Sequence, residues 1–203
     1  IMEILAAFKE QYPSMALTVS MDNANELFRA LGNFEIDVAI VTAVDLTAEF
    51  FGVAFTRLDL VLLVPDGHPW CRRKSISLDM LKGQPIILRE TTSTTRQLFM
   101  QALEDVGVTA TVVMELRNQV AVREAVAAGL GLAPELVGGM RRDERLHRIS
   151  IANAPVICHE YIACRKDRYS LHKVQAFFDT VKALAPVLAE RQIVWPNAID
   201  ARP

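Results

Sequence analysis

Apolar and polar residues follow one another along the chain with two different periods, and each period predicts a different element. Apolar residues that return every three or four positions indicate helices, whereas alternation or a short unbroken apolar run indicates strands. The first pattern predicts helices over 1–12, 26–32, 78–81, 95–106, 119–128 and 171–190. The second predicts strands over 17–20, 36–41, 50–55, 58–64, 86–88, 111–116, 146–151 and 157–164, and a short or irregular one within 130–137.

The order of these elements favours an α/β fold. Strands alternate with helices, and 36–41 is a nearly continuous apolar run of the kind found in strands that are buried on both faces. We therefore expect mostly parallel sheets. The sequence P-D-G-H-P at 65–69 breaks the chain between two β–α series, which predicts two lobes.

Composition and charge narrow the class of protein. The chain has 203 residues, of which 51% are hydrophobic, so it can bury a sizeable core. Its net charge of −2 argues against a nucleic-acid surface within this chain. No apolar run approaches the length of about 20 residues that a membrane helix needs. Three cysteines do not indicate a disulfide scaffold and favour a cytoplasmic protein.

One polar stretch stands out between a buried strand and a helix. Residues 89–98 read R-E-T-T-S-T-T-R-Q-L, so five neighbouring positions carry hydroxyl groups. One interpretation is helix capping, in which a side-chain oxygen accepts from the first turn. The other is ligand binding, because a helix start with added hydroxyl donors suits a carboxylate, a sulfate or a phosphonate. The stretch alone leaves both interpretations open.

The sequence offers little support for catalysis or for metal binding. None of the four histidines stands in a nucleophile or zinc motif, and neither H-x-x-C at 68–71 nor C-H at 158–159 matches a strong zinc spacing. There is no G-x-S-x-G elbow and no P-loop, and G-L-G at 129–131 follows a helix rather than a strand. We therefore predict no catalytic residue, no cofactor and no metal, and we expect that the protein is not an enzyme.

Six short motifs in order make the chain resemble a known family. They are F-x-x-x-Y-P at 8–13, E-L-x-x-x-L-x-x-x-x-x-D-V-A-I at 26–40, L-V-L-L-V-P-x-x-H-P at 60–69, I-S-L-x-x-L at 76–81, S-x-x-R at 93–96 and V-A-A-G-L-G-L-A at 126–133. Together they resemble the effector-binding region of LysR-type transcriptional regulators, over about residues 1–185.

The resemblance implies a fold of two Rossmann-like α/β lobes joined by two crossover strands, similar to type II periplasmic binding proteins. Lobe I would comprise 1–64 and 165–203, and lobe II would comprise 65–164, with crossovers near Val64 and Ala163. It also implies a homodimer or tetramer that reaches DNA only through a separate N-terminal winged helix-turn-helix. The chain opens at Ile1 inside a helical pattern, so we expect that it was cut from a longer protein.

The family places a small anionic or zwitterionic effector in the cleft between the lobes, against two helix starts. The residues implied as ligand-binding are Ser20, Asp22, Asn23, Thr92, Ser93, Thr94, Asn118 and Glu124. Asp22 either caps its helix or, like Glu124, meets an ammonium group on the ligand. Arg96 matches the family arginine, and it is either a ligand contact or a structural residue that pairs with an acid.

A narrower resemblance concerns the ligand. The pairing of E-T-T-S-T-T-R with V-R-E-A-V-A-A-G-L-G is similar to regulators associated with aminoethylphosphonate catabolism. The pair Pro134-Glu135 departs from the family pattern, which has an apolar strand there. Two other classes remain open: a periplasmic solute-binding protein of a transporter, and an enzyme on the same two-lobe fold. The upstream coding sequence would separate the first of these from a regulator.

Overall fold

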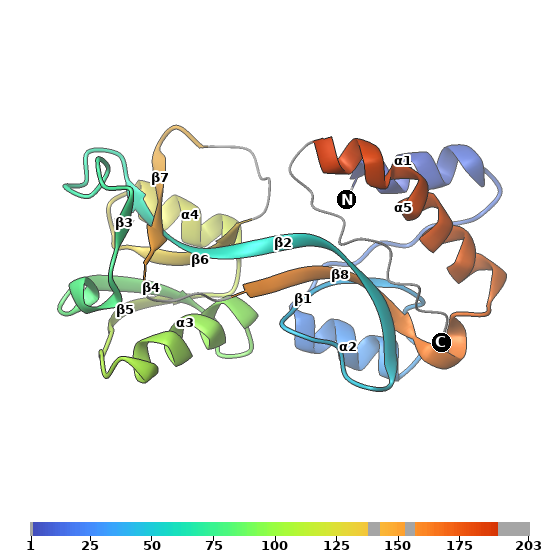
Figure 1. Cartoon of the computed structure of the whole chain (residues 1–203), viewed down its shortest axis with the longest axis horizontal. Coiled ribbons are helices and arrows are strands. Elements are labelled where there is room, and N and C mark those ends of the chain that lie inside the picture. Colours follow the sequence, from blue (N-terminus) through green and yellow to red (C-terminus); the bar gives the residue numbers. More distant parts are fainter. Residues whose placement is uncertain (1, 138–142, 153–156, 191–203) are drawn as a thin grey trace. The chain divides into compact units, whose positions relative to one another are not determined.

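The structure of the chain is a computed structural model that describes residues 2–137, 143–152 and 157–190 (Figure 1). The chain forms two compact units. Unit 1 holds the residues up to Arg57 and those from His159 onward, and unit 2 holds Leu58 to Cys158. The chain therefore leaves unit 1 once and returns once, which is the connectivity of two lobes joined by two crossover strands.

Two long strands carry the chain from one unit to the other. β2 (Phe50–Pro65) places its first half in unit 1 and its second half in unit 2. β8 (Ile157–Arg165) begins in unit 2 and ends in unit 1. The family resemblance implied crossings near Val64 and Ala163, whereas the units divide after Arg57 in β2 and after Cys158 in β8.

Unit 1 packs helices against a small antiparallel sheet. Besides its parts of β2 and β8, its elements are α1 (Met2–Gln11), α2 (Ala24–Gly32), β1 (Ala39–Ala43), the 3-10 turn η2 (Lys166–Arg168) and α5 (His172–Glu190). β1 runs antiparallel to β8, with Ala39 opposite Ala163. In α1, Ile4 and Phe8 are buried on one face, and the ring of Phe8 lies 5.3 Å from that of Phe177 in α5. This shared apolar stripe holds α1 and α5 together.

Unit 2 is built around two parallel strands whose carboxyl ends lead into helices. Its elements besides parts of β2 and β8 are β3 (Ser75–Ile76), the 3-10 turn η1 (Leu78–Leu81), β4 (Pro85–Arg89), α3 (Thr94–Asp105), β5 (Thr111–Leu116), α4 (Gln119–Ala127), β6 (Ala133–Val137) and β7 (Leu146–Ile151). β4 and β5 pair in parallel, and residues 86–88 of β4 are fully buried. Because α3 follows β4 and α4 follows β5, both helix starts lie at the same edge of this pair.

The segment after α4 returns to β4 through a close backbone contact at Gly131. The N–H of Leu132 donates to the carbonyl of Pro85 at 2.8 Å, and the N–H of Ile87 donates to the carbonyl of Leu132 at 2.7 Å. A Cβ atom at position 131 would lie 2.8 Å from that same Pro85 oxygen. The approach therefore depends on a residue without a side chain.

Three expectations about strands were wrong. Residues 17–20 form no strand, and Leu17 and Val19 remain 40% and 54% exposed. The segments 50–55 and 58–64 are a single strand, β2. The pairing is not mostly parallel, since β1 with β8 and β2 with both β6 and β7 are antiparallel. Residues 60–64 form an apolar run and are buried, yet β2 pairs there with the antiparallel strands β6 and β7. An apolar run therefore indicates burial on both faces but not whether the pairing is parallel.

Two further points concern the C-terminal tail and the search for a membrane-spanning helix. The tail from Val194 onward, for which the sequence shows little pattern, lies outside the described residues. In the part of the chain that the structure describes, no helix combines the length and the apolar character that crossing a membrane requires.

Candidate functional site

The hydroxyl-rich turn joins β4 to α3, and its serine occupies the capping position. Ser93 is the N-cap of α3, with extended backbone angles (φ −72°, ψ 126°), and is only 4% exposed. Its side chain nevertheless makes no capping hydrogen bond to the first turn, a turn that the structure describes in full. Thr92 is exposed, and Thr94 is half-buried as the first residue of α3. The hydroxyl of Ser93 is therefore not committed to capping.

The other two helix starts of the predicted site are capped by asparagine. The Asn23 side chain accepts from the N–H of Glu26 at 3.1 Å at the start of α2. The Asn118 side chain accepts from the N–H of Val120 at 2.7 Å at the start of α4. Each bond satisfies one of the amide donors that a helix start leaves open. The start of α3 differs from both, because its N-cap residue gives no such bond.

Arg96 fixes α3 to the two parallel strands. Its guanidinium donates to the carbonyl of Arg89 in β4 at 2.8 Å and forms an ion pair with Glu115 in β5. The structural interpretation of Arg96, in which it pairs with an acid, is confirmed. The residue holds the first turn of α3 against the carboxyl edge of the sheet and so positions the hydroxyl turn.

The start of α4 rests on a buried carboxylate, Glu135, at a position where the sequence departs from the family pattern. Glu135 in β6 is 1% exposed and accepts from the side-chain amide of Gln119 at 3.1 Å. The guanidinium of Arg123 lies 3.7 Å away and that of Arg148 lies 3.4 Å away. The signal was a charged residue inside an apolar strand pattern. Its partners could not be identified, because they lie on α4 and on β7.

Glu124 is engaged at the surface of unit 2. Its carboxylate accepts two hydrogen bonds from the guanidinium of Arg145, at 2.6 and 2.8 Å. These hydrogen bonds lower the pKa of Glu124, so the carboxylate is charged at neutral pH. Arg145 also pairs with Asp143 at 2.9 Å. An ammonium group on a ligand would therefore have to compete with Arg145 for this carboxylate.

The remaining predicted residues belong to unit 1. Ser20 and Asp22 are exposed in the segment before α2. The expectation that Asp22 caps this helix was wrong, because the N-cap is Asn23. The carboxylate of Asp22 instead accepts from the N–H of Asn23 at 2.9 Å. An N-cap side chain accepts from the backbone N–H of the second or third helical residue. Asp22 lies one residue before the N-cap, so its side chain does not reach those N–H groups.

Apart from Glu124, which pairs with Arg145 at the surface of unit 2, the predicted residues fall into two groups. Thr92, Ser93, Thr94 and Asn118 lie at the carboxyl edge of β4 and β5 in unit 2, where two helix starts converge. Ser20, Asp22 and Asn23 precede α2 in unit 1. The carboxyl edge of parallel strands is the usual position of ligands in α/β folds, so the first group is the better candidate site.

A shallow pocket of about 160 Å³ in unit 1 contains none of the predicted residues. It is lined in part by Phe34, which has a positive φ of 62°, and by the guanidinium groups of Arg165 and Arg168, each 4.6 Å from the centre of that ring. Lys173 in its wall pairs with Asp37 at 2.7 Å. Two of its three cationic residues, Lys173 and Arg165, pair with acids, so we regard this pocket as the weaker candidate for an anion.

The sequence as a whole matches a known domain family. The family described as "LysR substrate binding domain" matches residues 1–186. The HTH-type transcriptional regulator CbbR of Rhizobium meliloti is 26% identical over 86% of this chain and 57% of its own length. The HTH-type transcriptional activator CmpR of Synechocystis is 26% identical over 94% of this chain and 64% of its own. The chain therefore spans less than two thirds of either relative.

Solved structures show the same fold. The regulatory domain of Synechocystis CcmR, determined in complex with 2-PG, superposes with a TM-score of 0.80 at 21% identity. The match covers 90% of this chain and 89% of that one. The prediction of a type II periplasmic-binding-protein-like fold of the LysR effector-domain kind is confirmed.

Proposed function

The chain belongs to the LysR substrate binding domain family, and we propose that it is the ligand-sensing part of a transcriptional regulator. CbbR and CmpR are transcriptional regulators and are longer than this chain, which leaves room in such a protein for a winged helix-turn-helix. The net charge of −2 suits a sensing part better than a DNA-binding surface. In this proposal DNA is bound by the rest of the protein, as a homodimer or tetramer in the cytoplasm.

The main support for this proposal is the arrangement of hydroxyl groups at the start of α3. The chain places five hydroxyl-bearing residues there, yet the buried N-cap residue, Ser93, does not cap the helix. A helix start has amide donors without intrahelical partners and the positive end of the helix dipole, and together with a hydroxyl donor these favour a bound anion. The hydroxyl turn, residues 91–95, would thus donate to the acidic group of the effector.

We infer that the effector is a small anion or zwitterion, with a phosphonate such as aminoethylphosphonate as the specific candidate. The hydroxyl turn offers donors for a phosphonate, and the exposed carboxylate of Asp22 offers an acceptor for an ammonium group. The complex of the CcmR domain with 2-PG gives a second probe. Asp22 and Ser93 belong to different units. The proposal that they contact the same ligand therefore rests on the family resemblance.

The proposed mechanism is a shift between two arrangements of the units. A ligand changes such an equilibrium only by the difference between its affinities for the two states. Contacts to α3 that form in one arrangement would supply that difference. The shift would alter how the subunits of the regulator assemble and thereby how the DNA-binding parts meet their operator.

Replacement of Ser93 by alanine tests the proposed site. We expect Ser93→Ala to weaken binding of 2-PG or 2-aminoethylphosphonate by about tenfold or more, because a hydrogen bond to a charged group contributes roughly 1.5–3 kcal/mol. Isothermal titration calorimetry of the two proteins measures this ratio. The same titrations identify which of the two probes, if either, resembles the natural effector.

The matched control is Ser77→Ala. Ser77 is also an N-cap residue in unit 2 whose side chain makes no capping bond, but the turn that it precedes has only four residues. This variant should bind each probe as the unmodified protein does. If Ser93→Ala also binds every probe with unchanged affinity, the hydroxyl turn is not the effector site.

A further inference from the structure

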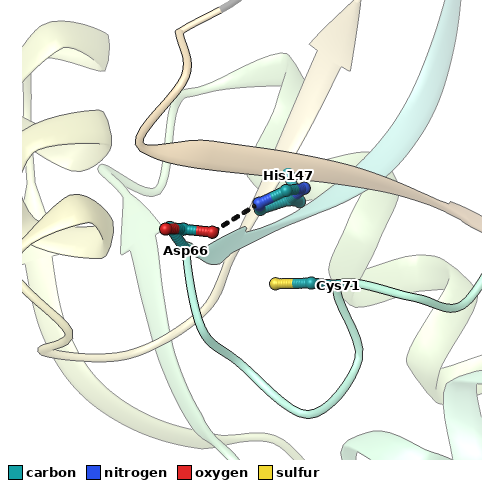
Figure 2. Close-up of side chains that lie close together, drawn as sticks. All are labelled: Asp66, Cys71 and His147. Atoms are coloured by element: carbon teal, nitrogen blue, oxygen red, sulfur yellow. Dashed lines mark hydrogen bonds and ion pairs between the residues drawn. The ribbon is translucent and has the colours of Figure 1, made fainter.

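Three side chains with metal-binding atoms face one another in unit 2, outside the predicted effector site. The carboxylate of Asp66, the thiol of Cys71 and the imidazole of His147 each offer one ligand atom, and these atoms all lie within 4.8 Å of one another. Oδ1 of Asp66 and Nε2 of His147 are 2.9 Å apart. Figure 2 shows the thiol of Cys71 directed toward this pair from the neighbouring turn.

Backbone pairing brings these residues together from distant parts of the sequence. β2 and β7 are antiparallel, with Val64 opposite His147. One residue past the end of β2, the N–H of Asp66 still donates to the carbonyl of Arg145 at 2.9 Å. The pairing of β2 with β7 therefore holds Asp66, just past the end of β2, beside His147 of β7.

The turn after β2 supplies the third group. It reverses at Gly67, which has a positive φ of 78°. The N–H of Cys71 donates to the carbonyl of His68 at 2.9 Å. Its thiol donates to the carbonyl of Pro65 at 3.2 Å, so the sulfur already points back toward the end of β2. The turn thus presents Cys71 without a large rearrangement.

A carboxylate oxygen, a thiolate sulfur and an imidazole nitrogen together favour zinc and similar transition-metal ions. Thiolate and imidazole are the preferred ligands of zinc, whereas Mg²⁺ and Ca²⁺ prefer oxygen atoms. In a tetrahedral zinc site the ligand atoms lie about 3.3–3.6 Å apart. The observed separations, 2.9 Å between Asp66 and His147 and no more than 4.8 Å elsewhere, require only small side-chain shifts to reach that geometry.

We propose that Asp66, Cys71 and His147 form a binding site for one Zn²⁺-class ion, with water as the fourth ligand. On binding, the thiol of Cys71 loses its proton to solvent. The imidazole of His147 gives up its hydrogen bond with Asp66 and coordinates through a ring nitrogen without a proton, so that its one N–H proton lies on the other nitrogen. The carboxylate and the thiolate then balance the charge of the divalent ion. The side chains of Asp66 and His147 are 76% and 38% exposed, so the ion enters directly from solvent.

The sequence motif H-x-x-C at 68–71 holds two side chains of metal-binding type, His68 and Cys71, but the structure does not bring these two side chains together as ligands. Nδ1 of His68 accepts from the N–H of Trp70 at 3.2 Å. Cys71 lies instead with His147, which is distant in the sequence, so no spacing rule could have found this site. None of the three ligands is among the residues predicted to bind the effector, so this site does not rest on the proposed function.

Titration of the 203-residue protein tests the site. The protein is stripped with a chelator, kept reduced with a phosphine and titrated with Co²⁺, followed by absorption, and with Zn²⁺, followed by calorimetry. We expect one ion per chain with a dissociation constant on the order of micromolar or lower. Bound Co²⁺ should show a thiolate-to-metal charge-transfer band.

Variants decide which residues bind the ion. Cys71→Ser should abolish the charge-transfer band, and both Cys71→Ser and His147→Gln should weaken Zn²⁺ binding by at least about tenfold. The control His172→Gln, which changes an exposed histidine of unit 1, should leave it unchanged. Should Cys71→Ser and His147→Gln prove misfolded by circular dichroism, Asp66→Asn decides, because it alters a mostly exposed side chain. Absence of saturable binding, or equal affinity in the folded variants, overturns the proposal.

Discussion

Glu135 places a carboxylate in the interior of unit 2, with 1% of its surface exposed. Burial of a charge is costly unless opposite charges and hydrogen bonds compensate for the lost water. Arg123 and Arg148 supply the charge, and Gln119 supplies a hydrogen bond. At this scale the sequence could show that a charge interrupts an apolar strand, but not which residues neutralise it.

We therefore predict that Glu135→Gln destabilises the protein by about 3 kcal/mol, because it leaves two partly buried guanidinium groups without their counter-charge. Urea unfolding followed by circular dichroism measures the change in the free energy of unfolding. Glu104→Gln, on the exposed face of α3, is the control and should change it by less than about 0.5 kcal/mol. A similar small effect of both substitutions would show that the buried ion pairs do not stabilise the fold.

At the scale of elements, periodicity predicted most helices and strands within a few residues. The strands at 111–116 and 146–151 have the expected bounds, because each lies between clear breaks in the pattern. The prediction of a strand at 17–20 was wrong. Apolar and polar residues alternate there, but no neighbouring strand pairs with the segment in the described structure, so its apolar side chains are not buried. The break expected at 56–57 failed because a continuous strand tolerates the buried Thr56 beside the exposed Arg57.

The contact between β4 and the segment after α4 gives a prediction about a single element junction. Gly131→Ala should lower the free energy of unfolding by about 1–3 kcal/mol, because the new methyl group would overlap the carbonyl of Pro85. Urea denaturation tests this value. Gly32→Ala is the matched control, since a Cβ at that position meets nothing within 4 Å. It should leave stability unchanged or raise it by up to about 1 kcal/mol, and a loss at position 32 equal to that at 131 would contradict the steric explanation.

The junction of α4 with β7 gives a prediction about pH. Hydrogen bonds from Arg145 lower the pKa of Asp143 from its ordinary value of 3.8 to about 2. Because the folded-state pKa is depressed, this stabilisation is fully present above about pH 4 and is lost as the pH falls through about 2. A carboxyl NMR titration of Asp143 should show the low value, and Arg145→Gln should return it toward 3.8. An unshifted pKa in the unmodified protein would contradict the pairing.

At the scale of the whole molecule, the sequence pattern predicted a division at 65–69, and the family resemblance implied two crossings. The two units divide instead between Arg57 and Leu58 and between Cys158 and His159, so the break at 65–69 lies inside unit 2. The order of the elements was readable because proline and glycine interrupt the pattern and because family motifs occur in a fixed order. The helix starts of the candidate site were readable for the same reason, since hydroxyl and asparagine side chains precede apolar helical patterns. A site assembled from distant segments, such as that of Asp66 and His147, leaves no such trace, because strand pairing alone creates it.

We propose that the first turn of α3 receives the acidic group of an effector. The most direct measurement follows the backbone amide NMR signals of the protein during titration with 2-PG and with 2-aminoethylphosphonate. We expect saturable shifts that are largest at residues 93–96, because the anion would lie against the first turn of α3. Saturable shifts confined to other residues, or unchanged signals at 93–96 at millimolar concentrations of both probes, would contradict it.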